Sequence, residues 1–196
     1  GNTKVQIVEA GNFEIYNIKS DKIPIILNCN AFGSGEHETT KSCLDIISSI
    51  DLYGKKVLDM GSGTGILSFA SLKKGADCAV CFDISFEACI NLKENAHYNC
   101  LNNIYTICST IDAIKSNFDV IFANIYSNII LCNIKKIDDL LNKKGLLVAS
   151  GVNYEYNFEI RNEFNKLGYE TLKTIFLEDY VTMVLKKWMK KMQKKE

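Results

Sequence analysis

The residues best suited to chemistry lie in a glycine-rich turn near the middle of the chain. Gly61, Gly63 and Gly65 alternate directly after an apolar run that contains Asp59, and a helical pattern begins at once. Glycine is needed where the backbone takes positive φ or approaches a ligand closely. The stretch therefore predicts a buried strand, a tight turn and a helix whose start faces a cofactor.

The spacing of these glycines indicates which cofactor they hold. Dinucleotide sites show the pattern G-x-G-x-x-G, whereas this chain has G-x-G-x-G. The carboxylate of Asp59 would repel a pyrophosphate, but it can accept a hydrogen bond from an ammonium group. The turn thus favours S-adenosylmethionine, which carries an ammonium group and no phosphate, over NAD.

Two more polar residues end predicted strands. Asp83 ends the strand after the glycine turn, where a carboxylate can accept hydrogen bonds from ribose hydroxyls in either kind of nucleoside site. Asn124 ends a later strand, and its carboxamide oxygen can accept a hydrogen bond from an amine nucleophile. An asparagine that caps the following helix is the alternative interpretation of Asn124.

A polar loop ahead of the turn is a further candidate part of the site. Phe32 can cover an adenine or a methionyl chain, and Gly33 allows the loop to fold over a pocket. Thr39 and Thr40 can cap the next helix or bind the cofactor. His37 fits either a surface loop or the site.

Alternating strand and helix patterns place these residues. Such alternation predicts an α/β, doubly wound, mostly parallel sheet with an antiparallel hairpin at its C-terminal edge. Ligands in these sheets bind outside the carboxyl ends of the strands. We predict strands at residues 57–60, 79–84, 104–108, 119–123, 146–149, 169–176 and 180–186, and helices at 66–74, 86–98, 128–141 and 154–167.

Composition fits one globular domain with additions at both ends. The 196 residues are 47% hydrophobic, and Lys+Arg and Asp+Glu number 23 each, so no overall field favours nucleic acid. We expect an N-terminal hairpin, with strands at 4–8 and 13–16, and a linker within residues 1–30, a catalytic domain at 31–186 and a basic tail at 187–196. The first residue is Gly1 rather than Met, which suggests a processed fragment.

Cysteine usage predicts a reduced, cytoplasmic protein. Of the eight cysteines only Cys78 and Cys81 have the CxxC spacing, and no second pair or suitable histidines complete a zinc site. We therefore expect no metal. No apolar run approaches the roughly 20 residues of a membrane span, so we expect no membrane association.

Four stretches in order, AFGSGEHETT, LDMGSGTGILSFASLKKGA, FDIS and FANI, resemble the PrmA-type methyltransferases of ribosomal large-subunit protein eleven. The resemblance covers residues 31–186 and implies a seven-stranded class I methyltransferase with a Rossmann-like sheet. It implies S-adenosylmethionine-dependent N-methylation of lysine ε-amino and α-amino groups of a ribosomal protein. It also implies cofactor-binding roles for Thr40, Gly61, Asp83 and Asn124, with Phe32, Gly33, His37, Thr39, Asp59, Gly63, Gly65, Ile84 and Ile125 as neighbours.

The chain departs from the family pattern in three respects. Ser34, Glu36 and Glu38 stand where the family loop has Thr, Thr and Pro, and the two glutamates add negative charge near the entrance. Tyr180 stands where the family often has Trp. The family also carries an N-terminal substrate-recognition domain, whereas only about 30 residues precede the loop here.

The expected mechanism assigns catalysis mainly to positioning. A lysine ammonium must lose a proton before it attacks, and desolvation lowers its pKa. Asn124, the predicted catalytic residue, would then orient the neutral amine. The alternatives are a class I methyltransferase for another protein, RNA or a small amine, and a non-catalytic cofactor-binding module. The lysine tail is either a weak rRNA contact or a frayed end.

Overall fold

The structure is a computed structural model that describes residues 5–10, 13–17, 23–27 and 37–188, with side chains described from residue 23 onward. Its main feature is a sheet of seven strands in the order β5-β4-β3-β6-β7-β9-β8. The strands β3 to β7 are parallel, and β9 is antiparallel to both of its neighbours. The predicted fold class is confirmed, and the strands are β3 (Lys56–Met60), β4 (Cys78–Asp83), β5 (Ile104–Cys108), β6 (Phe118–Asn124), β7 (Leu141–Asn153), β8 (Tyr169–Phe176) and β9 (Tyr180–Lys187).

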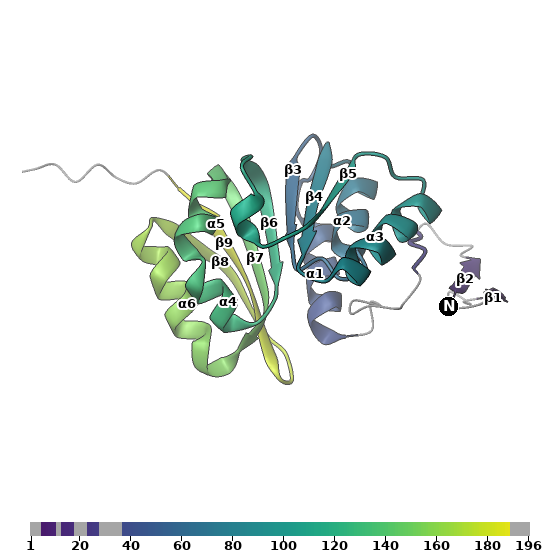
Figure 1. Ribbon diagram of the computed structural model, residues 1–196. Coiled ribbons are helices and arrows are strands. Elements are labelled where there is room, and N and C mark those ends of the chain that lie inside the picture. Colours follow the sequence, from purple (N-terminus) through teal and green to yellow (C-terminus); the bar gives the residue numbers. More distant parts are fainter. Residues whose placement is uncertain (1–4, 11–12, 18–22, 28–36, 189–196) are drawn as a thin grey trace, which may run out of the picture.

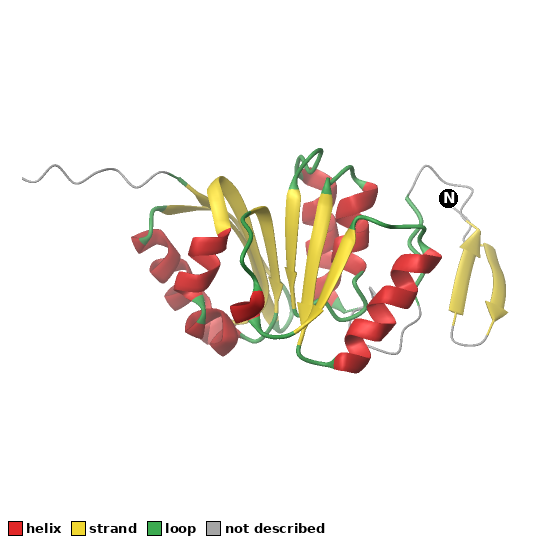
Figure 2. Cartoon of the chain, turned by 45° about the horizontal axis from the view of Figure 1, so that its top comes forward, coloured by secondary structure: helices red, strands yellow, loops and turns green. Residues whose placement is uncertain are grey.

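Helices cover both faces of this sheet (Figures 1 and 2). Side chains alternate between the faces along each strand. Val57 therefore packs against the helices on one face, which we call the first layer, and Leu58 packs against those on the other face, the second layer. Burial on both faces explains why the strands are continuously apolar. The first layer holds α1 (Glu38–Ser49), α2 (Ile66–Lys73) and α3 (Phe86–Tyr98), and the second holds α4 (Ser127–Cys132), α5 (Ile134–Leu140) and α6 (Tyr154–Lys166).

The N-terminal part forms a separate two-stranded antiparallel sheet, β1 (Val5–Ala10) and β2 (Phe13–Asn17). This confirms the predicted hairpin. The segment 23–27 then returns to the domain, where Asn99 bonds both backbone groups of Ile26, accepting from the N–H at 2.9 Å and donating to the carbonyl at 2.6 Å.

One predicted helix, at residues 128–141, is wrong as a single element. It is two short helices, α4 and α5, which meet at Asn133 with φ −122° and ψ 16°. The side chain of Asn133 donates to the carbonyl of Ile129 at 2.7 Å, and such local side-chain bonds compete with helix continuation. The next strand also begins earlier than predicted, at Leu141, and its pairing with β6 is irregular around Lys144, which has φ 65°.

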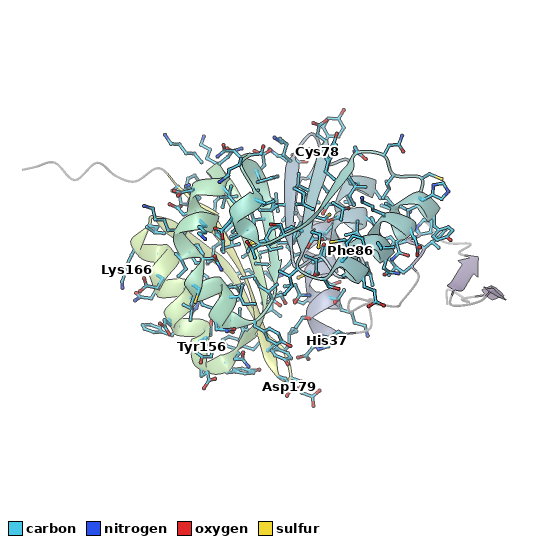
Figure 3. All side chains as sticks on the ribbon, in the orientation of Figure 1. His37, Cys78, Phe86, Tyr156, Lys166 and Asp179 are labelled. Atoms are coloured by element: carbon cyan, nitrogen blue, oxygen red, sulfur yellow. The ribbon has the colours of Figure 1, made fainter. Side chains whose placement is uncertain are left out.

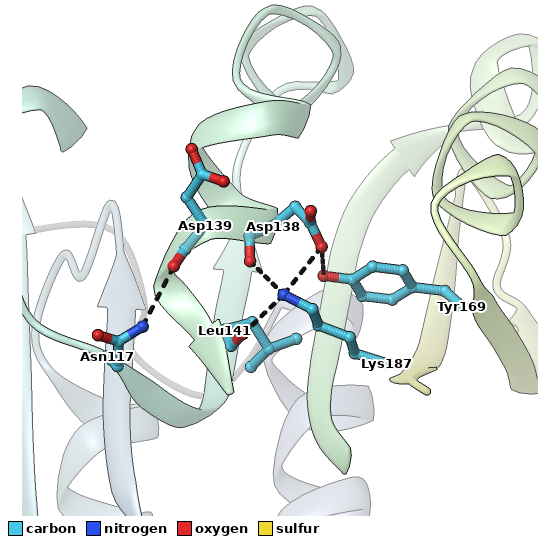
Figure 4. Close-up of polar contacts among 6 residues, drawn as sticks. All are labelled: Asn117, Asp138, Asp139, Leu141, Tyr169 and Lys187. Carbon is cyan, nitrogen blue, oxygen red and sulfur yellow. Dashed lines mark hydrogen bonds and ion pairs between the residues drawn. The ribbon is translucent and has the colours of Figure 1, made fainter. Parts of the chain in front are cut away.

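A polar cluster closes the end of the sheet where the parallel strands begin (Figure 4). The Lys187 ammonium donates to the carbonyls of Asp138 and Leu141 at 2.6 and 2.9 Å and forms an ion pair with the Asp138 carboxylate at 3.1 Å. The Tyr169 hydroxyl donates to the same carboxylate at 2.8 Å. This cluster joins α5, β7, β8 and β9, and we call it the Asp138 cluster.

Candidate cofactor and acceptor site

A cavity of about 680 Å³ opens at the opposite end of the sheet, where β3, β4 and β6 end. The chain runs from β3 towards β4 on one side, and β6 lies on the other side, so this is the switch point of the sheet. The volume is within the range of small-molecule and cofactor pockets. The residues around it are His37, Thr39, Met60, Gly61, Phe82, Asp83, Ile84, Thr110, Ile111, Asp112, Asn124, Ile125, Tyr126, Ile129, Asn133, Gly151 and Tyr180.

The glycine turn contributes Gly61 to the cavity lining, whereas Gly63 and Gly65 do not line it, and the turn has the expected backbone. Gly61, Gly63 and Gly65 have φ of 68°, 54° and 88°. A Cβ at Gly61 would lie 2.6 Å from Cγ2 of Ile125, and one at Gly65 would lie 2.7 Å from Cζ of Phe69. The turn therefore requires glycine both for its dihedral angles and for its close packing.

Asp83 is held at the cavity edge by two backbone groups. Its Oδ2 accepts from the Gly63 N–H at 3.3 Å, and its Oδ1 accepts from the Ser85 N–H at 2.9 Å. The carboxylate is half-buried and retains unused lone pairs on both oxygens. The turn and the end of β4 thus fix a carboxylate that can accept further hydrogen bonds from a ligand.

Asp59 occupies a different place from the other predicted site residues. Its side chain is 1% exposed, and its Oδ2 accepts from the Ser68 hydroxyl at 2.7 Å. Burial raises the pKa of Asp59 to about 6, and the nearby Asp83 carboxylate adds to the rise. The carboxylate lies beneath the turn and does not line the cavity. Sequence reasoning missed Ser68, although a serine one turn into the helix after the glycines is the available signal.

The loop after β6 forms another wall of the cavity. Asn124, Ile125 and Tyr126 all line it. A Cβ added to Gly151 would lie 3.3 Å from the Asn124 Oδ1, so the glycine leaves room beside the carboxamide. The loop is tied to the end of β7 because the Ser127 hydroxyl donates to the Asn153 side-chain oxygen at 3.1 Å and accepts from the Asn153 N–H at 3.0 Å.

The start of α1 forms the entrance. His37 caps the helix, its Nδ1 accepting from the Thr39 N–H at 3.2 Å, and its ring lies 5.7 Å from that of Tyr180. The Glu38 carboxylate accepts from the N–H groups of Glu178 and Asp179 at 3.0 and 3.1 Å. Glu38 therefore fastens the β8–β9 turn to the entrance; Figure 3 shows His37 and Asp179 at this end and Cys78 at the other.

The structure brings most of the predicted site residues together. His37, Thr39, Gly61, Asp83, Ile84, Asn124 and Ile125 line the cavity, and Gly63 bonds Asp83. Thr40 is buried beside this group, and its hydroxyl oxygen has no hydrogen-bond partner among the described residues. Phe32 and Gly33, together with Ser34, Gly35, Glu36 and the tail at 189–196, lie outside the described residues.

Sequence reasoning missed the loop after β5. Thr110, Ile111 and Asp112 line the cavity. The Lys136 ammonium bonds the Asp112 carboxylate and holds its pKa below the usual range. These residues follow the carboxyl end of a predicted strand, as Asp83 does. The rule that ligands bind outside the carboxyl ends of the strands could therefore have identified them.

The charges around the cavity suit a cationic ligand. Asp83 contributes a carboxylate held by backbone N–H groups, whereas the Asp112 carboxylate is already paired with Lys136, and none of the described lining residues is Lys or Arg. A phosphate-bearing ligand is normally bound with cationic side chains or a free helix start. The described part of the chain contains no group of three or more His, Cys, Asp or Glu side chains arranged to hold a metal ion. No helix within that part is long and apolar enough to cross a membrane.

Comparisons with known proteins identify the family of this chain. The family described as ribosomal protein L11 methyltransferase (PrmA) matches residues 4–188. A ribosomal protein L11 methyltransferase of Acetivibrio thermocellus is 34% identical over 92% of this chain, and one of Helicobacter hepaticus is also 34% identical over 92%. The chain spans 58% and 59% of the lengths of these two relatives.

Solved structures give the same result. The ribosomal protein L11 methylase of Lactobacillus delbrueckii subsp. bulgaricus has a TM-score of 0.74 and 27% identity, and the match covers 79% of this chain and 81% of that one. A tRNA m1G37 methyltransferase of M. jannaschii has a TM-score of 0.72 at 19% identity, which shows the shared fold alone; it covers 93% of this chain and 59% of that one. The family matches nearly the whole described length of this chain. The chain therefore belongs to the PrmA family of ribosomal protein L11 methyltransferases.

Proposed function

We propose that this chain is the catalytic part of an S-adenosylmethionine-dependent methyltransferase that methylates amino groups of ribosomal protein L11. One observation carries the proposal: the Asp83 carboxylate and the Asn124 carboxamide line the same cavity, at the switch point of the sheet. A carboxylate can accept hydrogen bonds from the hydroxyl groups of a nucleoside, and a carboxamide oxygen can accept one from the amine that receives the methyl group. The names of the family and of its relatives support ribosomal protein L11 as the methyl acceptor.

The residues present fit S-adenosylmethionine. Asp83 would accept from the ribose hydroxyls, and Ile84 with Ile111 offers apolar surface for the adenine. The hydroxyl oxygens of Thr40 and Ser62 are buried beside the site with no partner among the described residues. Since buried hydroxyls are normally hydrogen-bonded, they are candidates for binding the polar amino-acid part of the cofactor. Phe32 and Gly33 would extend the same wall.

The cofactor supplies an activated methyl group, so the chain's own task is to position an amine and exclude water. The cavity wall is largely apolar, with Ile125, Ile129 and Tyr126 near Asn124. Such surroundings lower the pKa of a lysine ammonium and so favour its neutral, nucleophilic form. The Asn124 oxygen would accept a hydrogen bond from the amine and orient its lone pair. Glu38 does not have this orienting role, because both of its carboxylate oxygens accept hydrogen bonds from the β8–β9 turn.

The proposed acceptors are lysine ε-amino groups, the α-amino group, or both. We also propose the division into an N-terminal hairpin and linker at 1–30, a methyltransferase domain at 31–186 and a basic tail at 187–196. Four lysines stand against one glutamate in residues 188–196, so this tail would make a weak rRNA contact, whereas Lys187 is bound in the Asp138 cluster. If so, removing residues 188–196 should make ribosome association less salt-dependent.

The test of the proposal is binding of S-adenosylmethionine by calorimetry. Asp83→Ala should weaken binding at least about 100-fold, because the fixed carboxylate is lost with its charge-assisted hydrogen bonds. Asp77→Ala is the matched control, since this exposed aspartate lies at the start of β4, away from the cavity. Undiminished binding by Asp83→Ala would contradict the assignment.

Methyl transfer is tested separately. The unaltered chain and labelled S-adenosylmethionine should label purified ribosomal protein L11, and mass spectrometry of the product would locate the modified amines. Transfer to a tRNA or to a small amine, with none to the protein, would replace the proposed acceptor while leaving the cofactor site unchanged.

A further inference from the structure

Four exposed aromatic side chains lie on the loop after β6, on α6 and on β8, and one of them, Tyr126, lines the cavity. Tyr126, Tyr154, Phe158 and Phe176 are 76%, 47%, 73% and 61% exposed, although they come from three different elements. Tyr154 stacks on Phe176 with ring centroids 6.0 Å apart and an interplanar angle of 23°. Tyr154 and Phe158 are four residues apart on α6, so they share a face of that helix. We call these four side chains the aromatic ledge.

Hydrogen bonds connect the ledge to the cavity wall. Tyr126 lines the cavity itself, and the bonded pair Ser127 and Asn153 joins its loop to the residue before Tyr154. The Tyr154 hydroxyl in turn donates to the carbonyl of Leu177. The Leu177 N–H donates at 2.8 Å to the carbonyl of Tyr180, which is another lining residue. Tyr126 therefore belongs to the cavity wall, Tyr154 and Phe176 are tied to it, and Phe158 follows one helical turn further along α6.

Four exposed carboxylates lie on α6 and the β8–β9 turn, close in sequence to the residues of the ledge. Glu155 and Glu159 lie on exposed positions of α6 next to Tyr154 and Phe158, and Glu178 and Asp179 lie on the exposed β8–β9 turn. This turn and the start of α6, marked by Tyr156, are at the same end of the molecule in Figure 3. The surface thus combines exposed aromatic rings with net negative charge.

The cations of the same elements offset these carboxylates only in part, because Arg161 alone lies near the ledge, three residues from Phe158 on the same face of α6. Arg161 donates to the side chain of Asn157, and Lys166 pairs with Glu163 at the far end of α6. Lys173 is three residues from Phe176 on β8, so its side chain leaves the opposite face of the strand. Near the ledge, four carboxylates therefore stand against the one guanidinium of Arg161, and the net charge of this surface remains negative.

We propose that the aromatic ledge binds a cationic, lysine-containing polypeptide segment next to the amine that enters the cavity. Aromatic faces attract ammonium groups and pack on the methylene chains of lysine. The four carboxylates add attraction for a cationic chain and repel nucleic-acid phosphates. The inference rests on the proposed function, because it assigns the ledge to the substrate of that same site.

Binding is tested by fluorescence anisotropy with a labelled short peptide of alternating lysine and alanine. Phe158→Ser should weaken peptide binding about five- to tenfold, as is usual for a contributing interface aromatic. The double variant Glu155→Gln, Glu159→Gln should weaken it about threefold and reduce its salt dependence. Two matched controls, Tyr53→Ser and Glu94→Gln, alter an exposed aromatic and an exposed carboxylate away from the ledge and should change nothing.

Three results would overturn the inference. They are failure of the unaltered chain to bind the lysine peptide, equal affinities for Phe158→Ser and Tyr53→Ser, and tighter binding of oligouridylate than of the peptide. The last result would make the ledge a platform for stacking bases. Thermal melting of each variant verifies that it is folded.

Peptide methylation separates this inference from the proposed function. Phe158→Ser should raise the KM for the peptide with little change in kcat or in S-adenosylmethionine affinity. If no amine is ever methylated but Phe158→Ser still weakens peptide binding, the proposed function fails and the ledge stands. If methylation continues with unchanged KM and peptide affinity, the ledge fails and the function stands.

Discussion

The two ends of the sheet treat polar side chains in opposite ways. At the Asp138 cluster, Lys187 and Tyr169 bond the same carboxylate, and each charge has a partner within the chain. At the cavity, Asp83 and Asn124 face open space, and the hydroxyl of Thr40 is buried with no partner among the described residues. Both ends are rich in polar groups, but the Asp138 carboxylate is paired with an ammonium group of the chain, whereas the Asp83 carboxylate is held by backbone N–H groups.

This difference separates groups that stabilise the fold from groups reserved for a ligand. Burial and the Asp138 carboxylate raise the pKa of the Tyr169 hydroxyl well above its usual value, so it remains a protonated donor. Asp83 is instead held by two backbone N–H groups that leave its outer lone pairs available. Substitutions at the two ends should therefore affect different measurements.

The largest effect on stability is expected at the Asp138 cluster. Lys187→Met should lower the free energy of unfolding by about 3 kcal/mol, because Asp138 loses its cation and two carbonyls lose their donor. Urea denaturation would measure the change, and S-adenosylmethionine affinity should stay the same. Lys166→Met is the control, since its exposed pair with Glu163 should contribute less than about 0.5 kcal/mol. Equal losses in both variants would erase the distinction.

The next largest effect is expected on catalysis at the cavity. Asn124→Ala should lower turnover about 100-fold, because the acceptor amine loses its orienting contact, while cofactor affinity falls less. Steady-state kinetics and calorimetry would separate the two quantities. Asn117→Ala provides the comparison from the other end of the sheet, where the Asn117 side chain donates to the carbonyl of Asp139. Equal loss of turnover and cofactor affinity would make Asn124 a cofactor ligand only.

Asp59 should give the protein a measurable pH dependence of stability. Its pKa is about 6 in the folded state against 3.8 for the ordinary group. A raised folded pKa means that the stabilisation is present below about pH 4 and is lost as the pH rises through about 6. Between pH 4 and 7 the unaltered chain should therefore lose roughly 2 kcal/mol of its free energy of unfolding relative to Asp59→Asn, which has no carboxyl group to ionise at this position. Urea unfolding across this range would measure it, with exposed Asp45→Asn as the control; parallel curves would contradict the shift.

The smallest effect is expected at the entrance. Glu38→Ala should cost about 1 kcal/mol, because the N–H groups of Glu178 and Asp179 lose their acceptors. Hydrogen exchange should become faster at these two amides, since the turn opens more readily. Glu178→Ala serves as the matched control, as it removes a neighbouring carboxylate and leaves the Glu38 contacts intact. Unchanged exchange in Glu38→Ala would show that the turn is held by its own strands.

Local patterns predicted the fold well and the site in part. The glycine turn was predictable because only glycine suits the positive φ of Gly61 and Gly65. The rule that ligands bind at strand ends placed Asp83 and Asn124 in one cavity before any contact was known. The predicted helix at 128–141 was wrong because apolar periodicity continues through Asn133, whose side chain interrupts the helix by a local bond.

By itself, therefore, the sequence determined the succession of strands and helices along the chain, the glycine turn and the residues at the strand ends. These depend on side-chain periodicity and on backbone preferences of single residues, which act over a few positions. Only the tertiary structure decided that Asp59 is buried against Ser68, that Glu38 holds the β8–β9 turn, and that the four aromatic residues form a ledge. Such contacts join segments distant along the chain, and their geometry exists only once the sheet has assembled.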